Sequence, residues 1–184
     1  MSIVNSLLKV FLGDKSGKDL KKLTPLVDEI NKHFIGLSSL SNDELRDKTH
    51  NFKKIISNKT TELVSSLKKL NESITNESSN IEKEKLFSEV EIVEKDLSET
   101  KTQVLDEILP EAFAVVKETA RRFYENESVK VSASEFDKEI GSKKSYVTID
   151  GESAIWKNLW DAAGKNVLWD MIHYDVQLIG GIVL

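Results

Sequence analysis

Two stretches of the chain repeat apolar residues at the spacing of helices that pair along one face. The first seam advances mostly in steps of three and four residues, and the second alternates steps of four and three. The seams are Phe52, Ile56, Leu63, Leu67, Leu70 and Ile74, then Leu86, Val90, Val93, Leu97, Thr100 and Val104. Because the stretch 71–80 between them is rich in Asn, Ser and Glu, the pattern predicts a long antiparallel helical hairpin over residues 41–109.

The two ends of this hairpin carry their own signals. Ser41 and Glu44 have the spacing of a capping box, in which each side chain bonds the other residue's amide. At the other end, Pro110 is expected to interrupt the helix, since proline lacks the amide hydrogen of a helix interior. Residues 110–125 are therefore predicted to form a separate helix with the proline in its first turn.

The pattern changes after residue 125. Apolar and polar residues alternate around Val129, residues 146–149 form a β-like run, and Asp150-Gly151 is a turn signal. Residues 154–156 and 167–169 are candidates for further strands. We expect a small β-rich insertion over residues 126–170 in a mainly α chain.

A continuous apolar run closes the sequence. It extends from Val176 to Leu184 and is interrupted only by Gln177 and by the Gly180-Gly181 pair. A short apolar run of this kind is typical of a buried strand. We expect residues 171–184 to contain the start of a strand.

A basic, amphipathic segment opens the sequence. Residues 1–23 carry a net charge of +3 within a chain of net charge −5. Residues 1–40 are predicted to form amphipathic helices, whose apolar face can either pack on the body of the protein or contact a membrane surface. The candidate membrane contacts are Ile3, Leu7, Leu8, Lys9 and Phe11.

Composition excludes several kinds of site. The chain has no cysteine, so disulfides and cysteine-based metal sites or nucleophiles are excluded. His33 and His50 are isolated and lack ligand-like spacing, and His173 is expected to be structural, so we expect no metal site. The negative net charge argues against general nucleic-acid binding. No apolar run reaches the roughly 20 residues that a membrane-spanning helix needs.

Three segments, in this order, resemble the SecA family of preprotein translocase motors. They are Leu40-Ser-Asn-Asp-Glu-Leu-Arg-Asp-Lys-Thr49, Leu109-Pro-Glu-Ala-Phe-Ala-Val-Val-Lys-Glu118 and His173-Tyr-Asp-Val-Gln-Leu-Ile-Gly-Gly181. The third is the most specific, and together they cover about a third of the chain. The stretches 57–105 and 125–170 resemble insertions of the Bacteroidetes branch of that family.

The resemblance implies the amino-terminal part of a P-loop helicase-type (α/β) motor, which uses ATP and magnesium to drive preproteins through the SecYEG channel. By the family's pattern, Gln177 would recognise the adenine edge, and Met171 and Tyr174 would pack against the ring. Position 172 is Ile where many relatives carry Arg, which puts any contact of that side chain in doubt. The implied partners are SecYEG, a preprotein or signal peptide, anionic phospholipid and a second copy, at the cytoplasmic face of the inner membrane.

The catalytic part of such a motor is not found in this sequence. A phosphate-binding loop has the form G-x-x-x-x-G-K-[ST], whereas the stretch Gly13-Asp-Lys-Ser-Gly-Lys-Asp19 is one residue too short and ends in Asp. We expect that the chain stops before that loop. Alone it should neither bind nucleotide tightly nor hydrolyse ATP.

Each candidate residue also has a purely structural interpretation. Gln177 could simply bond to backbone within an apolar element. The tryptophans at 156, 160 and 169 could form a small core rather than a ligand platform. Glu111 and Glu118 could do acid–base work, but solvation on a helix surface is the simpler expectation. The rival to the motor hypothesis is a stand-alone helical, membrane-associated scaffold without nucleotide binding.

Overall fold

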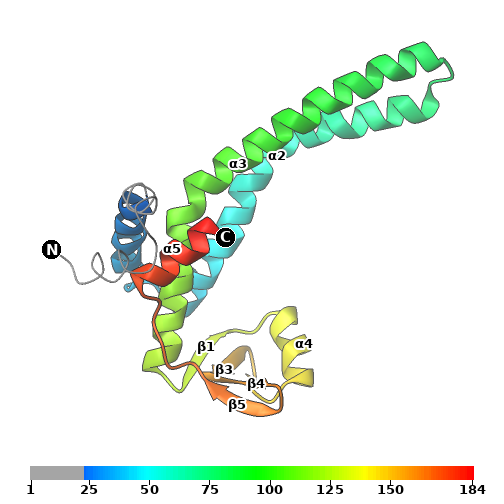
Figure 1. Ribbon diagram of the computed structural model, residues 1–184. Coiled ribbons are helices and arrows are strands. Elements are labelled where there is room, and N and C mark those ends of the chain that lie inside the picture. Colours follow the sequence, from blue (N-terminus) through cyan, green and yellow to red (C-terminus); the bar gives the residue numbers. More distant parts are fainter. Residues whose placement is uncertain (1–22) are drawn as a thin grey trace. The chain divides into compact units, whose positions relative to one another are not determined.

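The computed structural model describes residues 23–184, in two compact units (Figure 1). One comprises residues 49–109, and the other combines the described residues up to 48 with residues 110–184. Two long helices, α2 (Asn42–Asn76) and α3 (Asn80–Glu125), run through both units. The candidate membrane contacts from Ile3 to Phe11 lie outside the described residues. No helix among residues 23–184 is long and apolar enough to cross a bilayer.

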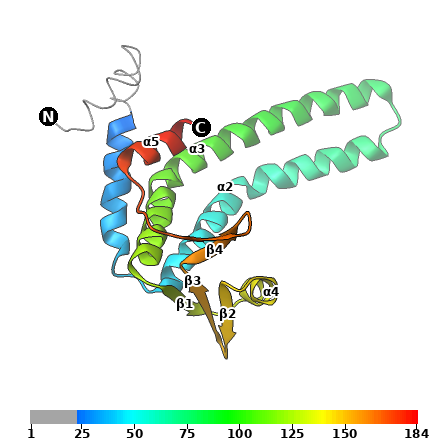
Figure 2. The same ribbon diagram turned by 60° about the horizontal axis from the view of Figure 1, so that its bottom comes forward.

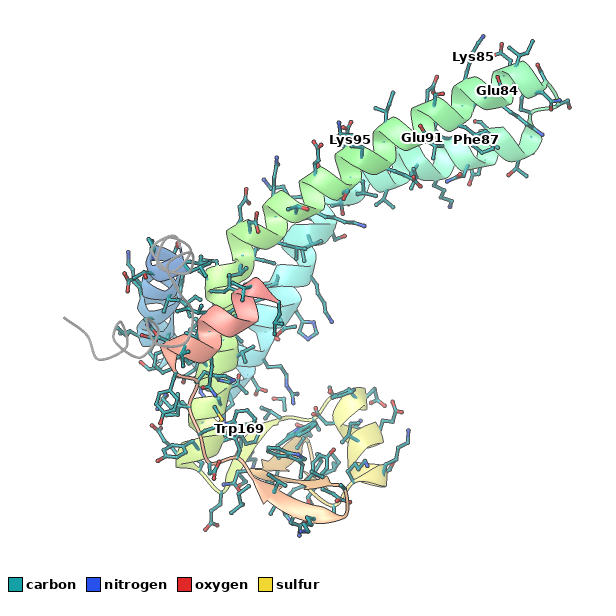
Figure 3. All side chains as sticks on the ribbon, in the orientation of Figure 1. Glu84, Lys85, Phe87, Glu91, Lys95 and Trp169 are labelled. Carbon is teal, nitrogen blue, oxygen red and sulfur yellow. The ribbon has the colours of Figure 1, made fainter. Side chains whose placement is uncertain are left out.

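The unit of residues 49–109 is the outer part of the predicted hairpin. The two helices lie side by side in both views (Figures 1 and 2) and are joined by residues 77–79. Every predicted seam position is buried or half-buried, with Val104 at 2% exposure, while most residues between them are exposed. The charged side chains of Glu84, Lys85, Glu91 and Lys95 lie on the exposed surface of α3 (Figure 3).

A polar residue completes the first seam. Thr60, between Ile56 and Leu63, is 6% exposed and was not predicted as a seam member. Its hydroxyl donates to the carbonyl oxygen of Ile56 at 2.9 Å. Burial of the hydroxyl is tolerated because its hydrogen bond is made within the helix.

The two ends of the hairpin differ in how well they were predicted. The capping box is confirmed: Ser41 Oγ accepts from the Glu44 amide at 3.2 Å, and Glu44 Oε2 accepts from the Ser41 amide at 2.7 Å. The prediction of a separate helix over residues 110–125 is wrong, because α3 continues through Pro110. Proline in a helix interior costs about 3 kcal/mol. Apolar burial beyond it, with Ala114 at 0% exposure, offsets that cost.

The β-rich region was predicted in outline. An antiparallel sheet has the order β1-β3-β2, with β1 (Ser128–Ser132), β2 (Val147–Asp150) and β3 (Ser153–Lys157). A second hairpin pairs β4 (Leu159–Ala162) with β5 (Lys165–Leu168). Gly151 has a φ of 58°, as the predicted turn requires.

A short helix within this region was missed. Helix α4 (Glu135–Lys143) follows β1, and its start has a capping box formed by Ser134 and Asp137. The two residues have the same sequence spacing as Ser41 and Glu44. This signal was therefore available in the sequence.

The prediction of a strand in residues 171–184 is wrong. The segment forms helix α5 (Asp175–Val183), with Leu178 buried. Periodicity cannot distinguish a strand from a helix in so short an apolar run. Gly181 lies so near α3 that a Cβ there would stand 3.0 Å from the Phe113 ring. The close contact between α5 and α3 thus depends on the missing side chain of Gly181.

Candidate functional site

The candidate site is the turn that leads from the β-rich region into α5. Residues 169–174 have no regular structure, and the Trp169 amide donates to the carbonyl oxygen of Asn158 at 2.7 Å. The Trp169 ring lies 5.7 Å from the Trp160 ring and 5.8 Å from the His173 ring, measured between centroids. In Figure 3, Trp169 lies beside the strands at the base of this turn. An aromatic cluster therefore supports the turn from the side of the β-rich region.

The side chain of Gln177 lies in the first turn of α5 and is exposed to solvent. Its Oε1 accepts a hydrogen bond from the Tyr174 amide at 2.9 Å, and its Nε2 lies 4.0 Å from the Met171 sulfur. The structure thus brings Met171 and Gln177 together. Tyr174 is the N-cap residue directly before α5, and it is 71% exposed.

The Gln177 amide has hydrogen-bonding capacity left. A carboxamide oxygen can accept two hydrogen bonds, and the nitrogen carries two donor hydrogens. One acceptor position is used by the Tyr174 amide, and the sulfur of Met171 is only a weak acceptor. A donor and an acceptor therefore remain side by side at the surface. The side chain also makes the backbone contact expected of a structural glutamine, which is the hydrogen bond from the Tyr174 amide.

The first turn of α5 is held by side-chain contacts with two other helical segments, and the sequence analysis did not predict these contacts. Asn31 donates from Nδ2 to Asp175 Oδ1 at 3.1 Å, and its own Oδ1 accepts from Lys117 Nζ at 2.7 Å. Lys117 Nζ is also 3.8 Å from Asp175 Oδ1 and 5.1 Å from the centre of the Phe34 ring. The three partners are separated by up to 144 positions in the chain, so no local pattern indicates the cluster.

The imidazole of His173 lies close to this anchor and is partly buried. Burial lowers the pKa of its imidazole, and the positive charge of Lys117 lowers it further. Its Nδ1 and the Trp169 Nε1 are buried and have no hydrogen-bond partner among the described residues. His173 therefore contributes ring packing to the turn, in agreement with a structural role.

The expectation that Glu118 is solvated on a helix surface is wrong. Its carboxylate is completely buried and accepts hydrogen bonds from Arg121 and Arg122 at 2.7 to 2.8 Å. Burial raises the pKa of this carboxyl, but the two guanidinium groups outweigh burial and hold the pKa below its usual value. Arg122 also donates to the carbonyl oxygens of Leu37 and Leu40. Glu118 therefore organises an ion-pair network rather than proton transfer.

Glu111 does not join Glu118 in a catalytic pair. It forms an ion pair with Lys48 at 2.8 Å. Among residues 23–184, no group of three or more His, Asp or Glu side chains is arranged to hold a metal ion.

The tryptophans line an apolar cavity of about 220 Å³ in the β-rich region, together with Phe123, Tyr146 and Leu159. Trp156 is fixed there because its indole nitrogen donates to Asp137 Oδ1 at 2.8 Å. All three tryptophans are half-buried, so their rings and this cavity suit a ligand platform as well as a small aromatic core.

Comparisons with known proteins agree with the motifs. Residues 8–184 match the family model described as the SecA DEAD-like domain, which indicates a helicase-type amino-terminal fold. Among curated proteins, the chain is 47% identical over 184 residues to the protein translocase subunit SecA of Flavobacterium psychrophilum. It is 48% identical over 184 residues to that of Christiangramia forsetii and 40% identical over 180 residues to that of Bacteroides fragilis.

These alignments cover 98 to 100% of this chain but 16% of each relative. They include the hairpin and the β-rich region, so both segments align with the relatives. No solved structure gives a significant match. From the family match and the identities over its full length, the chain belongs to the SecA family.

Proposed function

We propose that this chain is the amino-terminal segment of an ATP-driven translocase that moves preproteins through a membrane channel, and that it contributes adenine recognition. The named relatives are translocase subunits, and the chain matches them over nearly its whole length. The observation that carries the adenine role is the exposed Gln177 amide, which keeps a donor and an acceptor side by side.

Adenine offers the complementary pair of groups. Its N6 amino group donates and its N7 accepts, so a glutamine amide can bond both atoms at once. Met171 lies next to the amide and offers an apolar, polarisable surface for the ring. Tyr174 is exposed within the same turn and can provide a second face.

The phosphates and magnesium would be bound elsewhere. The 184 residues contain no G-x-x-x-x-G-K-[ST] motif, which is what supplies backbone amides and a lysine to phosphates. ATP supplies the free energy for transport once it is bound and hydrolysed. We expect no hydrolysis by this chain alone.

Contact with the channel and with anionic lipid belongs to the same proposal. It depends on the apolar face and lysine of the opening segment, namely Ile3, Leu7, Leu8, Lys9 and Phe11. Such a segment suits the interface of an anionic bilayer, at the cytoplasmic face of the membrane. A second copy and the preprotein are further proposed partners.

A substitution that preserves the helix cap tests adenine recognition. Gln177→Glu keeps an oxygen for the Tyr174 amide but removes the donor to adenine N7. The measurement uses a protein as long as the SecA relatives. There we expect Gln177→Glu to lower the affinity for ADP about 5- to 150-fold, which corresponds to the loss of a bidentate base contact. The melting temperature should stay unchanged. Gln177→Ala, which removes both the cap and the donor, should lower both quantities.

Equilibrium titration with ADP and calorimetric melting provide the two measurements. GDP serves as the control ligand, since its base lacks the N6 donor. Unchanged ADP affinity in both Gln177 variants would show that this amide does not recognise adenine.

A further inference from the structure

We propose that Asn31, Lys117 and Asp175 form a junction that positions the start of α5 and couples the helical segment 23–37 to adenine binding. The inference rests on the proposed adenine role of Gln177. Beyond that role, we infer that a residue in the segment 23–37 affects nucleotide affinity without contacting the nucleotide.

The junction joins three elements of the same compact unit. Asn31 lies on the helical segment 23–37, Lys117 on α3, and Asp175 is the first residue of α5. Asn31 is the centre: its amide nitrogen donates to Asp175 at 3.1 Å and its amide oxygen accepts from Lys117 at 2.7 Å. Each of the two functional groups of the asparagine side chain has one defined partner.

The junction is buried at Lys117 but not at Asp175, whose side chain is 48% exposed. Lys117 is 9% exposed, and its ammonium lies against the Asn31 oxygen, the Asp175 carboxylate and the face of the Phe34 ring. A buried charge that loses a partner is strongly destabilising, because desolvation is no longer compensated. The ammonium therefore favours the arrangement in which Asn31 and Asp175 both stay in place.

The junction and the adenine site share one helical turn. Asp175 precedes Gln177 by two residues. The backbone N–H of Gln177 donates to the Tyr174 carbonyl oxygen at 2.9 Å. A shift of Asp175 therefore shifts the backbone that carries Gln177. Because coupling between sites is reciprocal, ADP binding must also act on the segment 23–37.

A charge exchange tests the junction. Asn31→Asp removes the donor to Asp175 and places two carboxylates against each other. The double variant Asn31→Asp with Asp175→Asn restores a donor–acceptor pair in the opposite direction and still offers Lys117 a carboxylate. Lys32→Gln is the matched control, because it changes the net charge by the same −1 at the neighbouring, exposed position.

We expect Asn31→Asp to weaken ADP binding by the full-length protein at least about fivefold, the lower end of coupling between sites. The double variant should recover wild-type affinity to within about twofold, and Lys32→Gln should not differ from wild type. Recovery in the double variant also excludes misfolding as the cause of the loss.

A second readout reports the segment 23–37 itself. The 184 residues contain no cysteine, so Ile35→Cys, at a side chain that is 72% exposed, gives a labelling position unique within this segment. An environment-sensitive dye there should respond to ADP with the same half-saturation as binding. Asn31→Asp should abolish the response, and the double variant should restore it.

The outcomes separate the inference from the proposed function. If Gln177→Glu loses ADP affinity while Asn31→Asp binds ADP as wild type does, or if the dye does not respond to ADP, the coupling is wrong and adenine recognition stands. If neither Gln177 variant affects ADP binding, adenine recognition fails and the coupling inference fails with it.

Discussion

Asp137 is the residue whose replacement should damage the β-rich region most clearly. Its side chain is completely buried and accepts five hydrogen bonds: two from Arg46 at 2.8 Å, two from Ser134 and one from Trp156. These contacts link α4 to β3 and to the start of α2. In Asp137→Asn an NH2 group replaces one carboxylate oxygen. This group is a hydrogen-bond donor and would face the donor groups of Arg46, Ser134 or Trp156.

The size of the effect follows from this geometry. Removing one partner of a buried ion pair costs about 3–5 kcal/mol. The Arg46 side chain is 31% exposed and can regain water, and the amide keeps one acceptor oxygen. We therefore expect Asp137→Asn to lower the free energy of unfolding by about 2–3 kcal/mol, below the usual range for buried pairs.

Tryptophan fluorescence during urea unfolding measures this loss. The three tryptophans, at positions 156, 160 and 169, all lie in β3, in β4 or directly after β5, so their emission reports this region. Glu139→Gln is the control on the same helix, because its ion pair with Lys143 is more than half exposed. Exposed pairs contribute about 0–1 kcal/mol. If the two variants unfold at the same urea concentration, the buried network does not stabilise this region.

The contribution of the Asp137 carboxylate to stability should also appear in the dependence of unfolding on pH. Burial raises the pKa of Asp137, but the hydrogen bonds from Arg46, Ser134 and Trp156 outweigh burial and hold it well below its usual value. The unfolded state therefore binds the proton more tightly than the folded state. The stabilisation is complete above the unfolded pKa of about 3.9 and is lost as the pH falls toward the folded pKa. Asp137→Asn should unfold with a weaker dependence on pH below about 4.

Four further substitutions test packing and helix continuity. Glu118→Gln should lower the free energy of unfolding by about 3 kcal/mol, because it removes the carboxylate that pairs with buried Arg122 and one of the two carboxylates that pair with Arg121, as urea unfolding followed by circular dichroism will measure. Gly180→Ala should raise the free energy of unfolding by about 0.5–1 kcal/mol. Gly181→Ala should raise it less, because the new Cβ would meet the Phe113 ring. Equal increases in the two variants would contradict this close contact. Pro110→Ala should stabilise α3 by about 1–2 kcal/mol in a thermal melt, and destabilisation would contradict the assignment of one continuous helix.

The sequence predicted the features that depend on neighbours a few positions apart. The hairpin seam follows from spacings of three and four residues, and the capping box at Ser41 from a spacing of three. Features that depend on distant partners were missed. Arg46 and Asp137 are 91 positions apart, so no window of sequence shows that Asp137 is an ion-pair partner rather than a surface carboxylate.

Local rules also failed where tertiary packing outweighs them. Proline and paired glycines usually end helices, yet α3 passes through Pro110 and α5 contains Gly180 and Gly181. In α5 the missing Cβ of Gly181 is what allows the approach to Phe113. The site residues Met171 and Gln177 were named from the motif, but the placement of Gln177 on a helix rather than on a strand was not predicted.

That placement bears on how Gln177 would bind adenine. On a strand, its side chain would have to be ordered by the ligand, at the cost of its rotamer freedom. In the first turn of α5, the Tyr174 amide already holds Oε1 at 2.9 Å, and the second lone pair of that oxygen can accept from adenine N6. Nε2 gives up only a 4.0 Å contact with the Met171 sulfur to bond N7. In the proposed site the helix cap would therefore order the amide before adenine binds, because the cap and adenine N6 would use different lone pairs of Oε1.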